Sequence, residues 1–426
     1  MKLYNNPARN IWPQLCERPQ LDSEFLKSSV KNILARVKQG GDYTLKEFTR
    51  QFDHVELNDL SVSDEEIKQA IDHVKPELKV AIQTAASNIE LFHKVQLREV
   101  VKIETMKGVT CWRKGVPLEK AGIYIPGGTA PLFSTVLMLA IPAKLAGCKE
   151  VILISPPDKD GTIHPAILFA AQITGVTRTF KAGGAQAIAA LAYGTQSIPK
   201  VNKIFGPGNQ YVTKAKQLVN QQGVAIDMPA GPSEVLVWAD DSASPAFVAA
   251  DLLSQTEHGT DSQVMLVVNN AALAEKIEQE VQNQLATLPR KEIAEQALRN
   301  SRALVFENGA VALDFVNTYA AEHLIINTKN ADALAEKIVN AGSVFIGNYT
   351  PEAAGDYASG TNHTLPTNGY ATAYSGVSVE SFLKHITFQK ISEEGIKRLG
   401  PVVEIMAEAE GLLGHKNAIS IRLNNP

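Results

Sequence analysis

Short runs rich in valine and isoleucine alternate with alanine-rich helical segments through most of this chain. In the first series, such runs lie at 122–125, 151–154, 203–205 and 224–226. Alternation of this kind predicts a parallel sheet, because neighbouring parallel strands are joined by crossover helices. The central part of the chain is therefore expected to fold as an α/β unit.

A second series of apolar runs repeats the same order of elements. Its runs lie at 234–237, 264–268, 303–306, 324–326 and 344–346, again with helical stretches between them. No short-period repeat accompanies them, so the similarity is one of pattern and suggests duplicated halves. We predict an α/β fold with two tandem, incomplete Rossmann-like domains, each built on a parallel sheet.

The two ends of the chain differ from this centre. Residues 21–101 have apolar positions at spacings of three and four, which predicts helices. After Tyr349 the chain is rich in Gly, Thr, Asn and Pro as far as Gly376, and a short helical region follows at 379–414. A long stretch without regular structure usually carries function.

Composition and charge exclude several classes of protein. Hydrophobic residues make up 45% of the 426 residues and charged residues 20%, which is typical of a soluble globular protein rather than a disordered or coiled-coil one. The 41 Lys and Arg are outnumbered by 45 Asp and Glu. The chain therefore has no excess of positive charge with which to bind nucleic acid.

Three features predict a cytoplasmic protein without a membrane segment. Its three cysteines, Cys16, Cys111 and Cys148, are far apart and form no C-x-x-C pair, so a disulfide framework is not expected. Residues 1–12 lack the apolar run of a secretory signal. The most apolar stretch, 132–143, is interrupted by polar residues and proline and is shorter than the roughly 20 residues that span a bilayer.

The segment 244–259 reads as one complete helix, with Pro245 at its first position and Gly259 just beyond its end. Gln255 and His258 are then neighbours in the last turn, where the helix dipole favours a cation. This corner suits a metal ion. The alternative is that His258 only caps the last carbonyl groups of the helix.

Further metal ligands are available in two polar loops. One loop, 355–363, contains Asp356 and His363, and the other, 410–415, contains Glu410 and His415. Two histidines with one carboxylate form a familiar zinc set, whereas a glutamine oxygen is a rarer ligand that also tolerates other divalent ions. Sequence spacing alone does not show that these side chains converge.

Glu322 and His323 stand between a helical run and the apolar strand 324–327. A group that leads into a parallel strand lies opposite the usual ligand crevice, which argues against a catalytic role. An adjacent carboxylate and imidazole could nevertheless act as two proton carriers, with the carboxylate activating a water molecule. A solvated helix end is the alternative.

Glycine-rich turns follow several of the predicted strands, although the usual phosphate-binding and dinucleotide-binding fingerprints are absent. The turns lie at 125–129, 182–186 and 205–209. Backbone N–H groups in such turns can bind phosphate at a helix N-terminus. Their clustering in one α/β unit favours nucleotide binding, while the alternative is that they are merely tight turns.

Five segments together resemble the histidinol dehydrogenase family. They are Gly-Ile-Tyr-Ile-Pro-Gly-Gly at 122–128, Phe-Gly-Pro-Gly-Asn at 205–209, Asp-Met-Pro-Ala-Gly-Pro-Ser-Glu at 227–234, Ser-Gln-Thr-Glu-His-Gly at 254–259 and Ala-Glu-His-Leu at 321–324. The order of the segments, the length of the chain and the Gly-His pair ending at His415 also match. The resemblance covers nearly the whole chain.

The resemblance implies a cytoplasmic homodimer that oxidises L-histidinol to L-histidine through a bound aldehyde, with two NAD⁺ and one zinc ion per subunit, as the last step of histidine biosynthesis. It places the metal ligands on Gln255, His258, Asp356 and His415 and the proton carriers on Glu322 and His323. It places dinucleotide contacts on Tyr124, Gln186 and Asn209, and substrate contacts on Ser233, Gln255, His258, His323, Asp356, Glu410 and His415. Small N- and C-terminal extensions are expected to take part in dimerisation.

The expected division of the chain follows from the resemblance. Residues 1–20 form an N-terminal extension, and 21–110 together with 236–360 form a first α/β domain with most metal and catalytic residues. Residues 111–235 form the NAD-binding domain, and 361–426 form a C-terminal arm exchanged between subunits so that His415 reaches the partner's site.

The expected chemistry needs no cysteine nucleophile. His323 removes the hydroxyl proton of the alcohol, zinc holds the substrate in register, and Glu322 activates water against the aldehyde. Cys111 and Cys148 read as structural residues. Two other functions compete with this one: a metal-dependent hydrolase in which Glu322 activates water, and a non-catalytic protein that senses nucleotides or stores metal.

Overall fold

The computed structural model describes residues 1–19, 23–127, 131–229 and 231–424. Three expectations fall partly outside the described residues. They are the start of the first helix at 21, positions 128–129 of one glycine-rich turn and family segment, and position 230 of the 227–234 segment.

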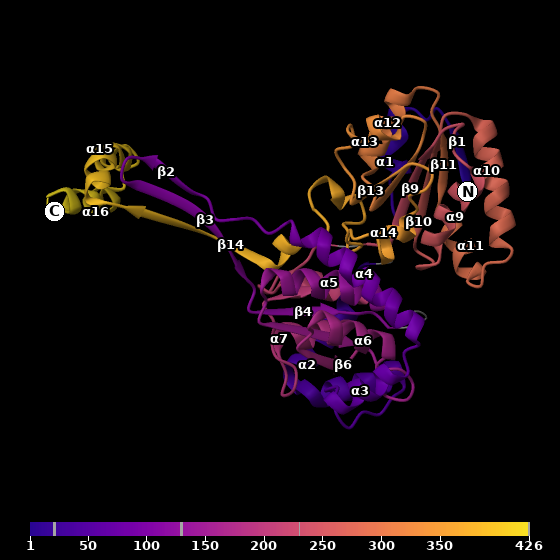
Figure 1. The fold of residues 1–426 in the computed structure, drawn as a ribbon, viewed down its shortest axis with the longest axis horizontal. Coiled ribbons are helices and arrows are strands. Elements are labelled where there is room, and N and C mark those ends of the chain that lie inside the picture. The colour runs from indigo at the N-terminus through magenta and orange to yellow at the C-terminus, as the bar shows by residue number, and fades with distance from the viewer. Residues whose placement is uncertain (20–22, 128–130, 230, 425–426) are drawn as a thin grey trace.

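Two parallel sheets form the body of the molecule (Figure 1). The five-stranded sheet has the order β6-β5-β4-β7-β8. Its strands are β4 (Lys120–Tyr124), β5 (Glu150–Ser155), β6 (Arg178–Lys181), β7 (Lys203–Phe205) and β8 (Ala225–Ile226). The six-stranded sheet has the order β1-β11-β10-β9-β12-β13. Its strands are β1 (Lys2–Asn5), β9 (Glu234–Ala239), β10 (Gln263–Val268), β11 (Arg302–Val305), β12 (His323–Asn327) and β13 (Ser343–Ile346).

The predicted tandem α/β fold is confirmed, and the two sheets share one strand order. In each, the first strand of the series lies third from one end, the next two strands follow on one side of it, and the last two lie on the other side. This is the doubly wound arrangement, with one switch point per sheet. The second sheet adds β1 as an edge strand, so Lys2–Asn5 of the expected N-terminal extension belong to the sheet.

Crossover helices cover both sheets. The five-stranded sheet carries α5 (Phe133–Ala146), α6 (Pro165–Thr174), α7 (Gly184–Tyr193) and α8 (Gln210–Asn220). The six-stranded sheet carries α9 (Pro245–Thr256), α10 (Ala271–Leu285), α11 (Lys291–Arg299), α12 (Gly309–Tyr319) and α13 (Ala331–Ala335). Short elements complete the body: α1 (Trp12–Leu15), α14 (Glu352–Tyr357), a π-helical turn (Thr49–Asp53) and 3-10 turns (Arg9–Ile11, Tyr370–Thr372, Val379–Phe382).

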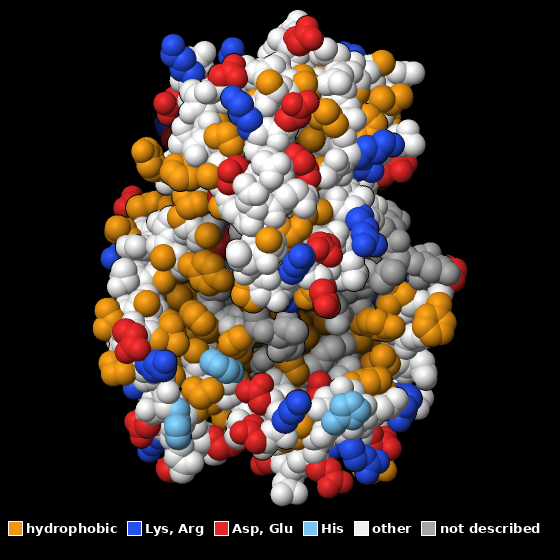
Figure 2. Space-filling model, turned by 90° about the vertical axis from the view of Figure 1, so that its right-hand side faces the viewer, with side chains coloured by type: hydrophobic (Ala, Val, Ile, Leu, Met, Phe, Trp, Pro, Cys, Tyr) orange, Lys and Arg blue, Asp and Glu red, His pale blue; other side chains and the backbone are white. Residues whose placement is uncertain are grey.

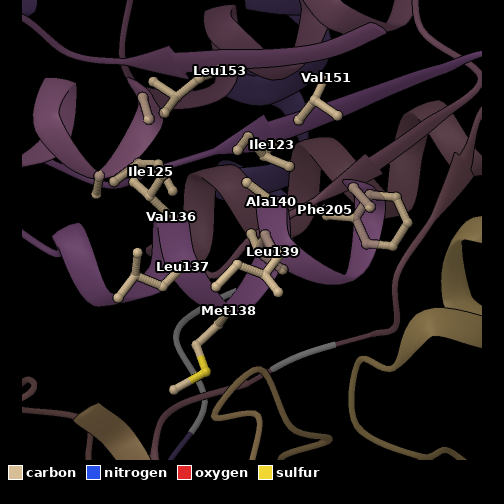
Figure 3. Close-up of a cluster of buried hydrophobic side chains, with 14 of the residues drawn as sticks. Ile123, Ile125, Val136, Leu137, Met138, Leu139, Ala140, Val151, Leu153 and Phe205 are labelled. Carbon is tan, nitrogen blue, oxygen red and sulfur yellow. The ribbon is translucent and has the colours of Figure 1, made fainter. Parts of the chain in front are cut away.

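A continuous apolar core lies between the five-stranded sheet and α5. Figure 3 shows Ile123, Val136, Leu139, Val151 and Leu153 gathered there, and all five are nearly or fully buried. α5 is buried on nearly all sides, which explains the long apolar stretch that the sequence shows at 132–143. Among the described helices, none is both long and apolar enough to cross a membrane.

The N-terminal helices cover the five-stranded sheet. α2 (Ser23–Phe48) packs against α7, α3 (Asp64–Asp72) against α6, and α4 (Pro76–Lys94) against α5. Val30 and Leu34 of α2 share a buried cluster with Leu191 of α7. This corrects the predicted grouping of 21–110 with 236–360, because an amphipathic pattern shows that a helix face is buried but not which sheet buries it.

An arm projects from the body (Figure 1). It combines an antiparallel sheet of β2 (Lys102–Met106), β3 (Val109–Pro117) and β14 (Leu383–Ile391) with α15 (Glu393–Ala409) and α16 (Leu413–Asn424). The arm is therefore built from two distant segments, of which only the second was predicted. It exposes the apolar side chains of Ile103, Met106, Ile386, Phe388, Ile391, Val402, Ile405, Met406, Leu412, Leu413 and Ile421.

Candidate active site

The predicted proton carriers lie at the amino edge of the six-stranded sheet. Glu322 directly precedes β12, and His323 is the first residue of that strand. Glu234 begins the neighbouring strand β9, and the register places His323 opposite Val235. Ligands of doubly wound sheets usually bind at the carboxyl edge, so this group occupies the opposite edge, as its sequence position implied.

His323 is surrounded by three carboxylates. Its Nδ1 lies 3.7 Å from Glu322 Oε2 and 3.8 Å from Glu352 Oε1, and its Nε2 lies 3.4 Å from Asp356 Oδ1. Glu352 and Asp356 are four residues apart on α14, so they lie on one face of that short helix. One ligand atom from each of His323, Glu352 and Asp356 lies within 4.8 Å of the others. Groups at this spacing can hold a metal ion.

The surroundings of Glu322 and His323 raise the pKa of both side chains. Burial raises the pKa of Glu322 to about 8, although the nearby imidazole opposes this shift. Burial acts to lower the pKa of His323, but the surrounding carboxylates, Glu352 foremost, outweigh it and hold that pKa well above its ordinary value. Both groups therefore release their protons at a higher pH than isolated side chains do.

The backbone of Glu234 binds both members of the pair. Its N–H donates to Glu322 Oε2 over 2.9 Å, and its carbonyl oxygen lies 3.3 Å from His323 Nδ1. The first residue of β9 thus fixes where the two side chains stand relative to the sheet.

Gln255, fully buried in the last turn of α9, faces the same group. With its amide oriented to satisfy its neighbours, its nitrogen donates to Glu352 and its oxygen accepts from the Glu234 N–H over 3.0 Å. The end of α9 and the start of β9 are thereby joined around the site.

The two histidines near Asp356 have different surroundings. His258 lies two residues beyond the end of α9 with an exposed surface, in the electrostatic range of Asp356 and His323. Both ring nitrogens of His363 have hydrogen-bond partners within the protein. Its Nδ1 donates to the Asp356 carbonyl over 2.8 Å, and its Nε2 lies 3.0 Å from Thr135 Oγ1 on α5. Of the two, His258 is the one whose ring has no such bonds among the described residues.

The residues present fit a divalent cation. Two buried atoms of the group, His323 Nε2 and Glu352 Oε2, have no hydrogen-bond partner among the described residues. In the opposite orientation of its amide, Gln255 would turn its oxygen toward Glu352, and with the imidazole of His258 and the carboxylate of Asp356 it would offer the donor types of zinc and related ions.

Other predicted site residues lie elsewhere in the chain. Glu410 and His415 belong to the projecting arm and are exposed, so within one chain the arm does not bring them to His323 (Figure 1). Ser233 is half-buried just before β9, and its carbonyl accepts from the Gln263 N–H. Of the four predicted metal ligands, Asp356 and Gln255 thus lie beside His323, His258 is near enough to be influenced by the charge of Asp356, and His415 lies apart in this chain.

The predicted dinucleotide contacts lie near the switch point of the five-stranded sheet, between β4 and β7. Tyr124 ends β4, and its hydroxyl accepts from the Gly184 N–H over 3.1 Å. Gln186 is buried in the first turn of α7, and Asn209 caps the N-terminus of α8. The intervening turn needs glycine at Gly206, where φ is 121° and a Cβ would meet the Tyr124 carbonyl at 2.1 Å.

Two residues of the site were missed from the sequence. Glu352 stands one helical turn before Asp356, a spacing that could have pointed to it. Glu234 was quoted only as the end of a family segment, although an acidic residue at the start of a buried strand is unusual.

The buried carboxyl of Asp251 on α9 should make the stability of the protein depend on pH. Burial raises its pKa to about 7, so between about pH 4 and pH 7 the folded protein keeps a proton that the unfolded chain releases. Stability therefore falls as the pH rises through that window. We expect Asp251→Asn to raise the free energy of unfolding by up to about 4 kcal/mol at pH 8 and to leave it unchanged below pH 4. Urea unfolding at both pH values measures this, and an equal effect at both would contradict it.

On the face shown in Figure 2, Lys and Arg lie interspersed with Asp and Glu, as the nearly balanced charge of the sequence predicts. Mixed charge of this kind is ordinary for the surface of a globular protein.

Comparison with known proteins places the chain in one family. The sequence model of the histidinol dehydrogenase family matches residues 16–423. Histidinol dehydrogenase of Bacteroides thetaiotaomicron is 59% identical over 424 residues, covering 100% of this chain and 99% of the relative. The Escherichia coli K12 enzyme of that name is 52% identical over 424 residues, covering 99% of this chain and 97% of the relative.

A solved structure agrees with these sequences. The crystal structure of histidinol dehydrogenase from Elizabethkingia anophelis superposes with a TM-score of 0.97 at 55% identity, covering 100% of this chain and 98% of that one. The resemblance stated from the five sequence segments is thus confirmed over the full length. This chain belongs to the histidinol dehydrogenase family.

Proposed function

We propose that this protein oxidises L-histidinol to L-histidine through a bound aldehyde, using two NAD⁺ for each substrate molecule. The observation that carries the proposal is the buried pair Glu322 and His323 beside Gln255 and Asp356, in a chain of this family. The two proton transfers of the reaction need one base for the alcohol and one for water, and the pair supplies an imidazole and a carboxylate.

In its neutral form, His323 takes the hydroxyl proton in the first oxidation. Its ring is held by the Glu234 carbonyl on the Nδ1 side, which leaves Nε2 to face Asp356. Glu322 removes a proton from water in the second oxidation, when the aldehyde becomes a hydrate. NAD⁺, when bound, accepts hydride in each oxidation.

A zinc ion fits as the substrate anchor. Gln255, His258 and Asp356 of one chain, with His415, would hold it, and the ion would bind the amine and imidazole of histidinol, which are good ligands for a borderline-soft cation. Asp356, which lies beside His323, would link the residues that hold the ion to the residue that accepts the proton.

The unit built on the five-stranded sheet is the proposed NAD⁺ site. Tyr124 and Asn209 flank its switch point, and Gln186 lies at the start of α7. The N-termini of α7 and α8 and the turns before them present backbone N–H groups that suit a pyrophosphate.

A homodimer with exchanged arms completes the proposal. The arm exposes a large apolar surface that an isolated chain would leave in water, which is typical of an interface. Exchange would bring Glu410 and His415 of one chain to the body of the other. A cytoplasmic location fits a soluble biosynthetic enzyme and remains part of the proposal.

The test is a stoichiometric assay. With histidinol and NAD⁺ the purified protein should form two NADH and one histidine for each histidinol consumed, and the near-ultraviolet absorbance of NADH follows the reaction. Hydrolysis of an amide or ester without NADH formation would instead favour the metal-dependent hydrolase. Bound metal without turnover of any amino alcohol would favour a storage or sensing role.

We expect Cys→Ser changes at Cys16, Cys111 and Cys148 together to leave both oxidations within about threefold of the unchanged protein. A thiolate nucleophile needs a low pKa. Burial instead raises the pKa of Cys16 and of Cys148 to about 11, so both are thiols near neutral pH. The assay above, run with histidinol and with the aldehyde, measures this. If Cys111→Ser or Cys148→Ser alone abolished aldehyde oxidation, that step would belong to a thiolate.

A further inference from the structure

A buried ion pair lies directly behind the candidate active site. Arg18 Nε donates to Glu234 Oε2 over 2.7 Å, and its Nη2 donates to Glu234 Oε1 over 3.2 Å. The side chains are 6% and 1% exposed. Such a two-point contact fixes the orientation of the carboxylate as well as its position.

Arg18 is itself held from three further directions. Its Nη1 donates to the Cys16 carbonyl over 2.8 Å and its Nη2 to the Tyr319 carbonyl over 2.6 Å. The guanidinium lies 3.8 Å from the centre of the Tyr319 ring. The arginine therefore has one conformation, and through it the carboxylate of Glu234 has one too.

The fixed position of Glu234 also fixes the proton carriers, because its backbone contacts both of their side chains. Its N–H binds Glu322, and its carbonyl lies against the ring of His323. The amide oxygen of Gln255 accepts from the same N–H. Among the described residues, Glu234 alone contacts the side chains of both proton carriers through its backbone.

We propose that Arg18 and Glu234 are positioning residues, which set the orientation of Glu322 and His323 for the two oxidations. The inference rests on the proposed function, and it assigns to the N-terminal segment a part in the reaction. Arg18 contacts Glu234, and Glu234 contacts the proton carriers through its backbone, so both would act through the pair that they orient.

The ion pair is better explained by orientation than by stability. Burying two charges costs desolvation free energy that their attraction roughly offsets, so apolar residues would stabilise the same place as well. The N-terminal segment is also anchored without it, since β1 pairs with β11 and Trp12 packs in the core. What an apolar replacement would lose is a fixed carboxylate at the first residue of β9.

The test compares Arg18→Met and Arg18→Lys with Arg302→Met as a matched control. Arg302 holds the same N-terminal segment through the carbonyls of Leu15 and Glu17, and among the described residues no hydrogen bond or ion pair joins it to Glu234. The readouts are kcat and KM for histidinol and for the aldehyde, metal content and the thermal unfolding temperature.

We expect Arg18→Met to lower kcat for both oxidations about tenfold to a hundredfold while KM and metal content change less than about threefold. Arg18→Lys keeps the charge and should recover part of kcat, and Arg302→Met should lower stability without lowering kcat. This pattern separates orientation from folding, because loss of folding lowers the active fraction and leaves the kcat of the remaining active sites unchanged.

Two results would overturn the inference. One is an unchanged kcat in Arg18→Met, and the other is an equal loss of kcat in Arg302→Met. If Arg18→Met failed to fold, a full kcat in Arg18→Lys, whose single ammonium cannot make the two-point contact, would overturn it as well. If the protein without substitutions did not oxidise histidinol at all, that result would contradict the proposed function itself, and this inference would fall with it.

Discussion

Changing Glu322 to glutamine should slow the oxidation of the aldehyde at least about a hundredfold and the oxidation of the alcohol far less. A positioned general base contributes about 10²–10⁴-fold to a proton transfer, and an amide of the same shape cannot accept the proton of water. The substituted side chain can still accept the Glu234 N–H bond, so the site should stay assembled. Single-turnover measurements with histidinol and with the aldehyde separate the two steps.

The pH dependence of the aldehyde step provides the control. Because burial raises the pKa of Glu322 to about 8, the unchanged protein should lose activity as the pH falls below about 8, where the carboxylate takes up its proton. The Glu322→Gln protein should lack that dependence. Equal losses in both oxidations would show that Glu322 supports the site as a whole and is not the base for water.

The elements near the site followed from local rules. Pro245 and Gly259 bracket one helix in the sequence, and the structure places α9 at Pro245–Thr256 with Gln255 in its last turn. The position of Glu322 and His323 before an apolar run likewise predicted the amino edge of a strand. Signals of this kind depend only on residues close together in the chain.

The partners of these residues did not follow from local rules. Glu352 and Glu234 are two of many acidic residues, and only the packing of α14 and β9 brings them to His323. Arg18 comes from a segment that the sequence presented as a polar extension. Convergence of this kind is set by tertiary structure, which no spacing within the chain encodes.

The arm shows the same limit on a larger scale. Its second segment, from β14 to α16, was expected as an arm from the family resemblance, although the sequence pattern there indicated helix and not the strand β14. Its first segment, β2 and β3, pairs with β14 across more than two hundred residues of sequence. Alternating strands at 102–117 could equally have joined a sheet of the body, because a short strand pattern does not specify its partner.

His415→Ala should remove most of the bound metal, even though His415 is exposed on the arm and remote from the other predicted ligands in its own chain. If the arm is exchanged, the change removes one ligand from the partner's site. His258→Ala should have the same effect from within the body. His385→Ala is the matched control, since His385 is another exposed histidine of the arm, on β14, with no proposed ligand role.

Mixing the two inactive proteins distinguishes an exchanged arm from a site made by one chain. In a mixed dimer the body of the His415→Ala chain meets the intact arm of the His258→Ala chain, which restores one of the two sites. Because random exchange makes about half of the dimers mixed, roughly a quarter of the metal and activity should return. Every site made within one chain would keep one of the two defects, so no recovery after complete subunit exchange would show that the ligands come from one chain and that His415 acts elsewhere.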